Sequence, residues 1–509
     1  MRLGIDFGTT RTVVASCDRG NYPVLGFADA GGDVADFFPS VVAEQGGELR
    51  FGFDALAVAG DPAWAVRRSF KRMLAGGAAP DREVTVGGTR LPVLELLARF
   101  LGALREAIVT RAGARETDVL EAVVATPANA HGAQRFATLD AFRRAGFDVT
   151  AMLNEPSAAG FEYTHRYRAT LTQRREHVVV YDLGGGTFDA SLLHISGRRH
   201  DVLATAGVTE LGGDDFDAVM ATAVLAAAKL DRDALPQRAM LALLEQCRAV
   251  KEGLNPNSRR VVIDLDACLG ELAPEPEIVL KTSDYYDACA PLVEETIEAM
   301  SPVLSRLGAE EDAAMGEVAG LYVVGGASSL PVVARVLRDR YGRRVHRSQY
   351  PSAAVAIGLA LAADRDAGFE VSDRLSRHFG VFREGNAGKD VVFDPIFDRD
   401  TKVPAVGEEV VYRRRYRPVH NLGRYRFVEC ARLDARGIPV GEMKAFDDVL
   451  FPFDAALRGE PRLGEVPVRR LAGEGPLIEE KYAVTPHGIV EVTITDLESG
   501  YGRKVQVGA

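Results

Sequence analysis

The chain has 509 residues, of which 47% are hydrophobic and 26% charged, and its formal net charge is −11. Because this length exceeds what one hydrophobic core usually covers, two or more domains are expected. The negative balance argues against a nucleic-acid-binding protein, since neutralising phosphates requires a basic surface.

The cysteines, the histidines and the N-terminus predict a cytoplasmic protein with no membrane partner. The five cysteines are odd in number, widely spaced and without a CxxC pair, so they are predicted to be reduced thiols. The nine histidines show no paired ligand spacing. The first predicted strand begins at Arg2, which leaves no room for a signal peptide, and no apolar run approaches the roughly 18 residues of a membrane helix.

Strands alternate with amphipathic helices from the N-terminus to about Asp366. Apolar stripes at three- and four-residue spacing predict helices at 94–108, 216–229, 241–253, 331–341 and 353–362. From about Arg377, short alternating segments such as 410–416 and 489–494 predict a small all-β domain. The segment 369–376 is the expected linker.

One turn pattern occurs twice, at residues 6–10 and 182–187, each time after a short apolar strand that ends in an Asp. The turns are rich in Gly and Thr, so backbone N–H groups can converge on phosphate oxygens. Asp6 and Asp182, with Asp189 just beyond the second turn, can hold a hydrated Mg²⁺ against the phosphates. A single copy would fit a hairpin or a helix cap equally well. Two copies in matching strand context predict a nucleotide held between two lobes.

Further segments in this order resemble the seventy-kilodalton heat-shock protein (DnaK-type) chaperone family. They are LGIDFGTTRTVVAS (3–16), FKRML (70–74), VVATPANAHGAQRFATLDAFRRAG (123–146), LNEPSAAG (153–160), VVVYDLGGGTFDAS (178–191), ELGGDDFD (210–217) and VVGGASSLP (323–331). The resemblance implies an α/β actin-like two-lobed ATPase domain over 1–368, the linker 369–376, and a small β-sandwich substrate-binding domain over 377–509. It looks like a short member of the family, because no helical lid is expected after the last strand.

The resemblance also implies a set of catalytic and nucleotide-binding residues. Lys71 would reach the γ-phosphate, and Glu155 would lie near the attacking water. The implied catalytic set is Asp6, Lys71, Glu155, Asp182, Thr187 and Asp189, of which Asp6, Asp182 and Asp189 would hold Mg²⁺ through water. The implied ATP/ADP-binding set is Gly8, Thr9, Thr10, Arg11, Gly184, Gly185, Gly186, Gly212, Gly213, Lys251, Gly325, Gly326, Ser328 and Ser329. K⁺ is a further candidate cofactor, and Pro127 matches a family proline thought to couple the domains.

The chain departs from the family pattern on the adenosine side. Ser329 and Glu252 stand where family members often carry arginines that stack on adenine, and Ser352 replaces an Asp. The loss of two cationic stacking planes predicts weaker nucleotide binding, by on the order of 0.5 to 2 kcal/mol for each contact. The linker also lacks the usual leucines, and Ala151 stands where many members have an Arg used by a J-domain co-chaperone.

The implied partners are unfolded or extended peptides, with a J-domain co-chaperone and a nucleotide-exchange factor as further candidates. Neither nucleic acid nor membrane is expected. The alternative is an ATP-binding regulatory or scaffold protein of the actin-like superfamily with weak or no turnover. An interleaved run of Arg and Tyr at 412–417 is interpreted as a solvated edge strand protected by charge, with a site for acidic peptides or nucleic acid as the alternative.

Overall fold

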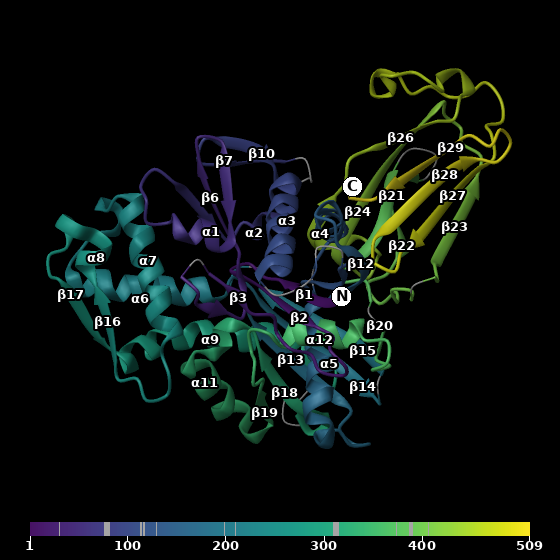
Figure 1. Ribbon diagram of the computed structural model, residues 1–509. Helices are drawn as coiled ribbons and strands as arrows, with labels where there is room; N and C mark the ends of the chain where they lie inside the picture. Colours follow the sequence, from purple (N-terminus) through teal and green to yellow (C-terminus); the bar gives the residue numbers. More distant parts are fainter. Residues whose placement is uncertain are drawn as a thin grey trace.

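The computed structural model describes residues 1–508 except 30, 76–81, 112–114, 116–117, 129, 198, 209, 309–314, 373, 386–389 and 406. The side chains of 72, 75, 111, 370–372 and 385 are not described either. Residue 129 of the segment 123–146 and residue 373 of the expected linker therefore lie outside the described residues. Figure 1 shows a two-lobed N-terminal part, with an all-β region from the C-terminal part of the chain beside helix α4.

Two mixed sheets with the same connectivity form the centre of the two lobes. The first has the order β12-β11-β1-β2-β5, with β1 Arg2–Phe7, β2 Arg11–Ser16, β5 Phe38–Pro39, β11 Glu121–Thr126 and β12 Asp148–Asn154. The second has the order β19-β18-β13-β14-β15-β20, with β13 His177–Leu183, β14 Phe188–Ser196, β15 Arg199–Val208, β18 Val318–Val324, β19 Val345–Arg347 and β20 Glu370–Ser372. In each sheet an antiparallel hairpin (β1–β2 or β13–β14) is joined by two parallel strands on the side of its first strand. The repeated turn is the turn of this hairpin in both lobes.

Helices α5 (Glu155–Tyr167) and α12 (Ala354–Ala363) lie between the two sheets and share one apolar core with both. They approach so closely that a Cβ added at Gly358 would lie 1.8 Å from the carbonyl oxygen of Ala158. Glycine is therefore required at this crossing, because a side chain there would collide with backbone.

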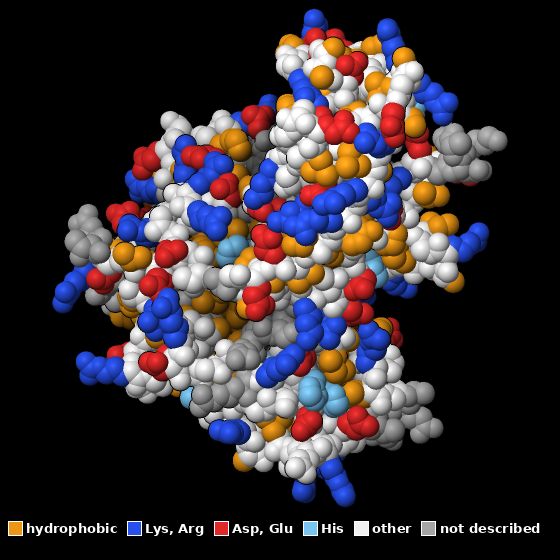
Figure 2. All heavy atoms as spheres, turned by 90° about the vertical axis from the view of Figure 1, so that its right-hand side faces the viewer, with side chains coloured by type: hydrophobic (Ala, Val, Ile, Leu, Met, Phe, Trp, Pro, Cys, Tyr) orange, Lys and Arg blue, Asp and Glu red, His pale blue; other side chains and the backbone are white. Residues whose placement is uncertain are grey.

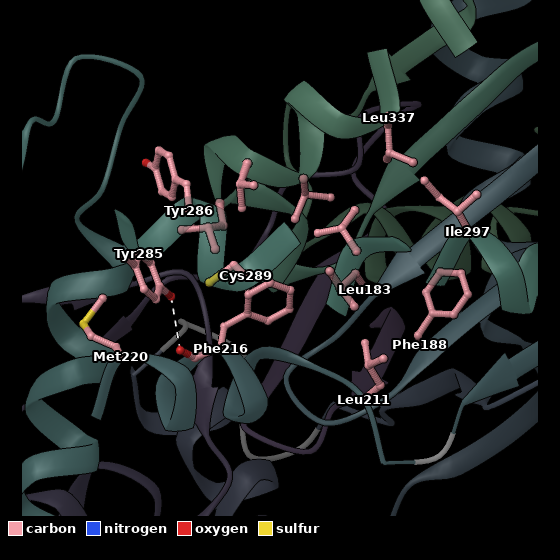
Figure 3. Packing of buried hydrophobic residues seen from close by; sticks show 14 of the residues in the cluster. Leu183, Phe188, Leu211, Phe216, Met220, Tyr285, Tyr286, Cys289, Ile297 and Leu337 are labelled. Atoms are coloured by element: carbon pink, nitrogen blue, oxygen red, sulfur yellow. Dashed lines mark hydrogen bonds between the residues drawn. The ribbon is translucent and has the colours of Figure 1, made fainter. Parts of the chain in front are cut away.

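Longer helices cover the outer faces of the sheets. Helices α3 (Val93–Arg111) and α4 (Gly132–Arg144) pack on the first sheet. Helices α6 (Gly213–Ala228), α9 (Thr282–Leu304) and α11 (Pro331–Tyr341) pack on the second. Figure 3 shows this second core, in which the Tyr285 hydroxyl donates a 3.2 Å hydrogen bond to the Phe216 carbonyl. The helices expected from apolar stripes are thus confirmed, with small differences at their ends.

Further elements extend each lobe (Figure 1). On the first they are β3 Phe27–Ala28, β4 Val34–Ala35, β6 Val41–Gln45, β7 Glu48–Phe51, α1 Gly52–Ala57, β8 Ala65–Arg68, α2 Arg72–Ala75, β9 Glu83–Val86 and β10 Thr89–Pro92. On the second they are α7 Gln237–Glu252, β16 Arg260–Asp264, α8 Leu265–Leu269 and β17 Glu277–Lys281. In the described part of the chain no helix combines the length and apolar character that crossing a membrane requires.

The C-terminal β region consists of two antiparallel sheets with a common apolar core. One has the order β22-β21-β24-β25, with β26 also paired to β24, and the other has the order β23-β27-β28-β29. The strands are β21 His378–Gly385, β22 Asp390–Phe397, β23 Val410–Tyr416, β24 Leu422–Leu433, β25 Pro439–Ala445, β26 Val449–Pro452, β27 Ile478–Val484, β28 Val490–Asp496 and β29 Gly502–Gln506. Strand β23 is at an edge, and Arg413 and Arg415 on it pair with Glu479. The interpretation of residues 412–417 as a charged edge strand is confirmed.

The side of the β region between the edge strands β22 and β23 is closed by an ionic network. Arg383 donates to both oxygens of the buried Glu480 and, through Nε, to Asp394 at 2.6 Å. Arg414 of β23 also donates to Asp394, at 3.0 Å. On the face of the molecule in Figure 2, acidic and basic side chains are interspersed and do not form one broad field of a single sign.

The expected linker contains a strand. Residues 370–372 form β20, which pairs in parallel with β15 at the edge of the second sheet. This segment lacks the leucines of the family pattern, which puts the coupling between the domains in doubt. Strand pairing provides a contact through the backbone, which does not depend on leucine side chains.

The β region contacts the first lobe at the start of α4. The Gly132 N–H donates to the Glu429 carboxylate at 2.8 Å, and Arg135 Nε donates to the carbonyl of His487 at 3.2 Å. Ile489, from the β region, is 1% exposed and belongs to the core of the first lobe. The two parts are therefore joined by buried apolar and polar contacts.

Candidate functional site

The two repeated turns face each other across a cavity of about 270 Å³ between the lobes. A Cβ added at Gly185 would lie 2.6 Å from the hydroxyl oxygen of Thr10, so the turns approach within contact distance only because glycine is present. The predicted site residues that line the cavity are Asp6, Gly8, Thr9, Thr10, Arg11, Lys71, Glu155, Asp182, Gly184, Gly185, Thr187, Gly213, Lys251, Gly325, Gly326 and Ser329. The structure thus brings together residues that are up to 323 positions apart, from Asp6 to Ser329.

Four of the predicted site residues do not line the cavity but lie behind it. A Cβ on Gly212 would be 2.5 Å from the backbone nitrogen of Gly186, so these two glycines pack on each other. The Ser328 hydroxyl donates to the Gly325 carbonyl at 2.7 Å and holds the turn in which Gly325 has a φ of +86°. Asp189 lies directly opposite Asp182 in the β13–β14 register.

Asp182 and Asp189 are buried, and Asp6 is partly buried. Burial raises the pKa of Asp6 to about 7, with Glu155 adding to the rise and Lys71 opposing it. Burial and the Glu155 carboxylate also raise the pKa of Asp182 and of Asp189 well above the usual range. An opposite charge favours the ionised form of such groups, so this end of the cavity favours a cation.

Lys71 and Glu155 form a pair on the first lobe. The Lys71 ammonium lies 3.3 Å from the Glu155 carboxylate and 5.3 Å from the centre of the Phe7 ring. The two side chains are only 8% and 12% exposed. Glu155 begins α5 directly after β12, so the end of a buried strand fixes its position.

Helix α7 forms the wall on the second lobe. Lys251 donates to the Gly213 carbonyl at 2.6 Å and pairs with Asp217 at the same distance. Arg248, one turn earlier, pairs with Asp214 at 2.8 Å, Asp217 at 3.1 Å and Glu245 at 3.3 Å. Arg248, Asp214 and Gln134 line the cavity but were not predicted. Arg248 could have been predicted from its position three residues before Lys251, because residues with this spacing lie on the same face of a helix.

Glu252 and Ser329 also line the cavity. Glu252 forms an ion pair with Arg11, which reaches it from the first lobe. The Arg11 guanidinium carbon lies 4.4 Å from the centre of the Phe37 ring. Among the described residues there is no group of three or more His, Cys, Asp or Glu side chains that could bind a metal ion directly.

Comparison with known proteins agrees with this architecture. The family profile described as "Hsp70 protein" matches residues 76–376, which is more than half of the chain. The chain belongs to the Hsp70 family.

Among the relatives of this Hsp70-family protein are bacterial chaperones. It is 36% identical over 386 residues to the chaperone protein HscA homolog of Bordetella pertussis, a match that covers 72% of this chain and 58% of that protein. It is 29% identical to the HscA homolog of Pseudomonas fluorescens strain SBW25, over 100% of this chain and 77% of that one. The chaperone protein HscA of Escherichia fergusonii is 34% identical over 380 residues, with 72% and 58% coverage. The match to the Bordetella protein therefore spans less than two thirds of that relative.

Proposed function

We propose that this Hsp70-family protein binds Mg-ATP between its lobes and hydrolyses it, and that it acts as an ATP-dependent chaperone in the cytoplasm. The observation that carries the proposal is the buried Lys71–Glu155 pair in the same cavity as the two facing Gly/Thr turns. A phosphate-binding turn alone would fit many classes of nucleotide-binding protein. A lysine and a carboxylate beside two such turns suit phosphoryl transfer to water.

Each group has a role that follows from its position. The N–H groups of the turns would bind the β- and γ-phosphates, and the Thr187 hydroxyl would contact the terminal phosphate. The Lys71 ammonium would stabilise charge on the oxygens of the transferred group, while Glu155 would accept a hydrogen bond from the attacking water. Lys251 and Arg248 fix the opposite wall through their carboxylate partners.

Asp6, Asp182 and Asp189 would hold Mg²⁺ through its water shell. The absence of a directly coordinating cluster among the described residues fits this arrangement, since Mg²⁺ usually keeps several waters in phosphate sites. When bound, Mg²⁺ neutralises phosphate oxygens. The raised pKa of Asp6 supports this assignment, because a nearby cation would favour its ionised form.

Single-turnover hydrolysis of radiolabelled ATP tests the proposal. We expect Lys71→Ala to reduce the rate by about 100-fold or more, while Mg-ATP binding remains measurable by calorimetry. Lys281→Ala is the matched control, since Lys281 is exposed on β17. A Lys71→Ala rate equal to that of the wild type would contradict the assignment.

We also propose that the β region, over residues 377–509, binds extended peptides and that residues 1–368 form the ATPase domain. Strand-lined sites bind peptides through main-chain hydrogen bonds and side-chain pockets. The ionic network of Arg383, Asp394 and Glu480 favours the alternative, a regulatory protein with weak turnover, because it places charge inside the β region. Binding of an unfolded apolar peptide, measured with and without ATP, separates the two proposals.

A further inference from the structure

Arg11 reaches from the first lobe to Glu252 on the wall that α7 forms on the second lobe. It begins β2 directly after Thr10, and its side chain reaches Glu252 at the end of α7. Both residues line the cavity. The side chain of Arg11 is 32% exposed, so the contact with Glu252 leaves part of it accessible.

The guanidinium group is held in a fixed orientation by two partners. Its carbon lies over the Phe37 ring, 4.4 Å from the ring centre. Phe37 is not among the residues that line the cavity, so it lies behind Arg11. Glu252 bonds to Nη2, at the edge of the planar group. The guanidinium therefore lies between Phe37 and the cavity.

The other cations in the described lining of the cavity are held by carboxylates or carbonyls. Lys71 pairs with Glu155, Lys251 pairs with Asp217, and Arg248 has three carboxylate partners. If the two turns bind the phosphates, the base lies against another part of the cavity lining, and the paired Arg11 and Glu252 belong to that lining.

We propose that Arg11 stacks on the base of the bound nucleotide, with Phe37 behind it and Glu252 holding its edge. The inference rests on the proposed function, and it identifies the residue that recognises the nucleobase. A planar cation on a π-face contributes about 0.5 to 2 kcal/mol, which offsets the loss of arginines at 252 and 329. Because the same side chain links the two lobes through Glu252, a base stacked on Arg11 would also stabilise this contact between the lobes.

Calorimetric titration with Mg-ATP and with Mg-tripolyphosphate, which has no base, tests the inference. We expect Arg11→Ala to weaken Mg-ATP binding by about 3- to 30-fold and to change tripolyphosphate binding by less than about 2-fold. Arg11→Lys keeps the charge but loses the planar guanidinium, so its affinity for Mg-ATP should lie between that of the wild type and that of Arg11→Ala. Phe37→Leu removes the supporting ring and should also weaken only Mg-ATP binding.

An equal loss for both ligands would mean that Arg11 binds phosphate, and no loss for either would mean that it does not touch the nucleotide; each result overturns the inference. These outcomes differ from failure of the proposed function, in which the wild type itself would not bind Mg-ATP. Such a result would remove the inference as well. Thermal melting of each unliganded variant checks that the fold is kept, and Arg11→Lys gives the answer if Arg11→Ala does not fold.

Discussion

Ser329 lies in the cavity at the end of the turn that begins with Gly325 and Gly326, and its carbonyl accepts a hydrogen bond from Arg347 at 3.4 Å. A base has two faces, and Arg11 can cover only one. We therefore expect Ser329→Arg to add a second stacking plane and to tighten ATP binding a few-fold, by about 1 kcal/mol at most. Calorimetry of the variant and the wild type measures this. Equal or weaker binding would show that Ser329 does not face the base.

The residues of the phosphate end could be predicted because their signal is local. An Asp followed within a few positions by Gly and Thr can be recognised in the sequence, and its repetition at 182–187 indicates a nucleotide site between two lobes. Arg248 and Asp214 could not be predicted in the same way, because their place in the cavity depends on how α6 and α7 pack. Gly212 and Ser328 were predicted as ligand contacts, yet they shape the turns from behind.

Helix α4 begins with a cap that depends on pH. The Nδ1 atom of His131 accepts a hydrogen bond from the Gln134 N–H. Burial, together with the nearby charges of Arg377 and Lys444, lowers the pKa of His131 from 6.5 to about 4. The neutral form is thus favoured in the folded state. The contribution of neutral His131 to the stability of the folded state is present above pH 6.5 and is lost as the pH falls through 4.

We expect His131→Asn to reduce the loss of stability between about pH 7 and pH 4.5 by up to 2 to 3 kcal/mol, since Asn can cap a helix without titrating. Thermal midpoints at the two pH values measure the effect. His200 and His487 also have a lowered pKa of about 4, so part of the pH dependence should remain. His194→Asn, beside Glu176, controls for the substitution itself. Identical pH dependence in His131→Asn and the wild type would contradict the role of His131.

Most helices were predictable because an apolar stripe at helical spacing is a property of one segment. The prediction at 331–341 coincides with α11, and that at 241–253 begins four residues after α7 does. Strand β20 was assigned to a linker instead. Its partner β15 lies about 170 residues earlier in the chain, and three residues are too few to show a period of two.

The arrangement of the whole molecule depends on contact between the β region and α4. A Cβ on Gly132 would lie 2.7 Å from a Glu429 carboxylate oxygen. We expect Gly132→Val to displace Glu429, to cost about 1.5 to 3 kcal/mol of docking energy for the lost charged hydrogen bond, and to separate the two parts. Small-angle scattering should then show a larger radius of gyration, and proteases should cleave faster between 370 and 377.

Gly102→Val is the matched control for this prediction. Gly102 also lies in a helix, but a Cβ added there meets no atom within 4 Å. Its scattering curve should match that of the wild type. If Gly132→Val gave the same curve and the same cleavage rate, the contact with Glu429 would not hold the two parts together.

The crossing of α5 and α12 is the point at which the backbones of the two helices touch between the lobes. A Cβ added to Gly358 would lie 1.8 Å from the Ala158 carbonyl oxygen, so no side chain separates the helices there. Glu155 stands at the beginning of α5, and Ser352 and Val355, at the cavity wall, stand at the beginning of α12. A rotation of one helix against the other at this contact would therefore change the distance between the Glu155 carboxylate and the cavity wall formed by Ser352 and Val355.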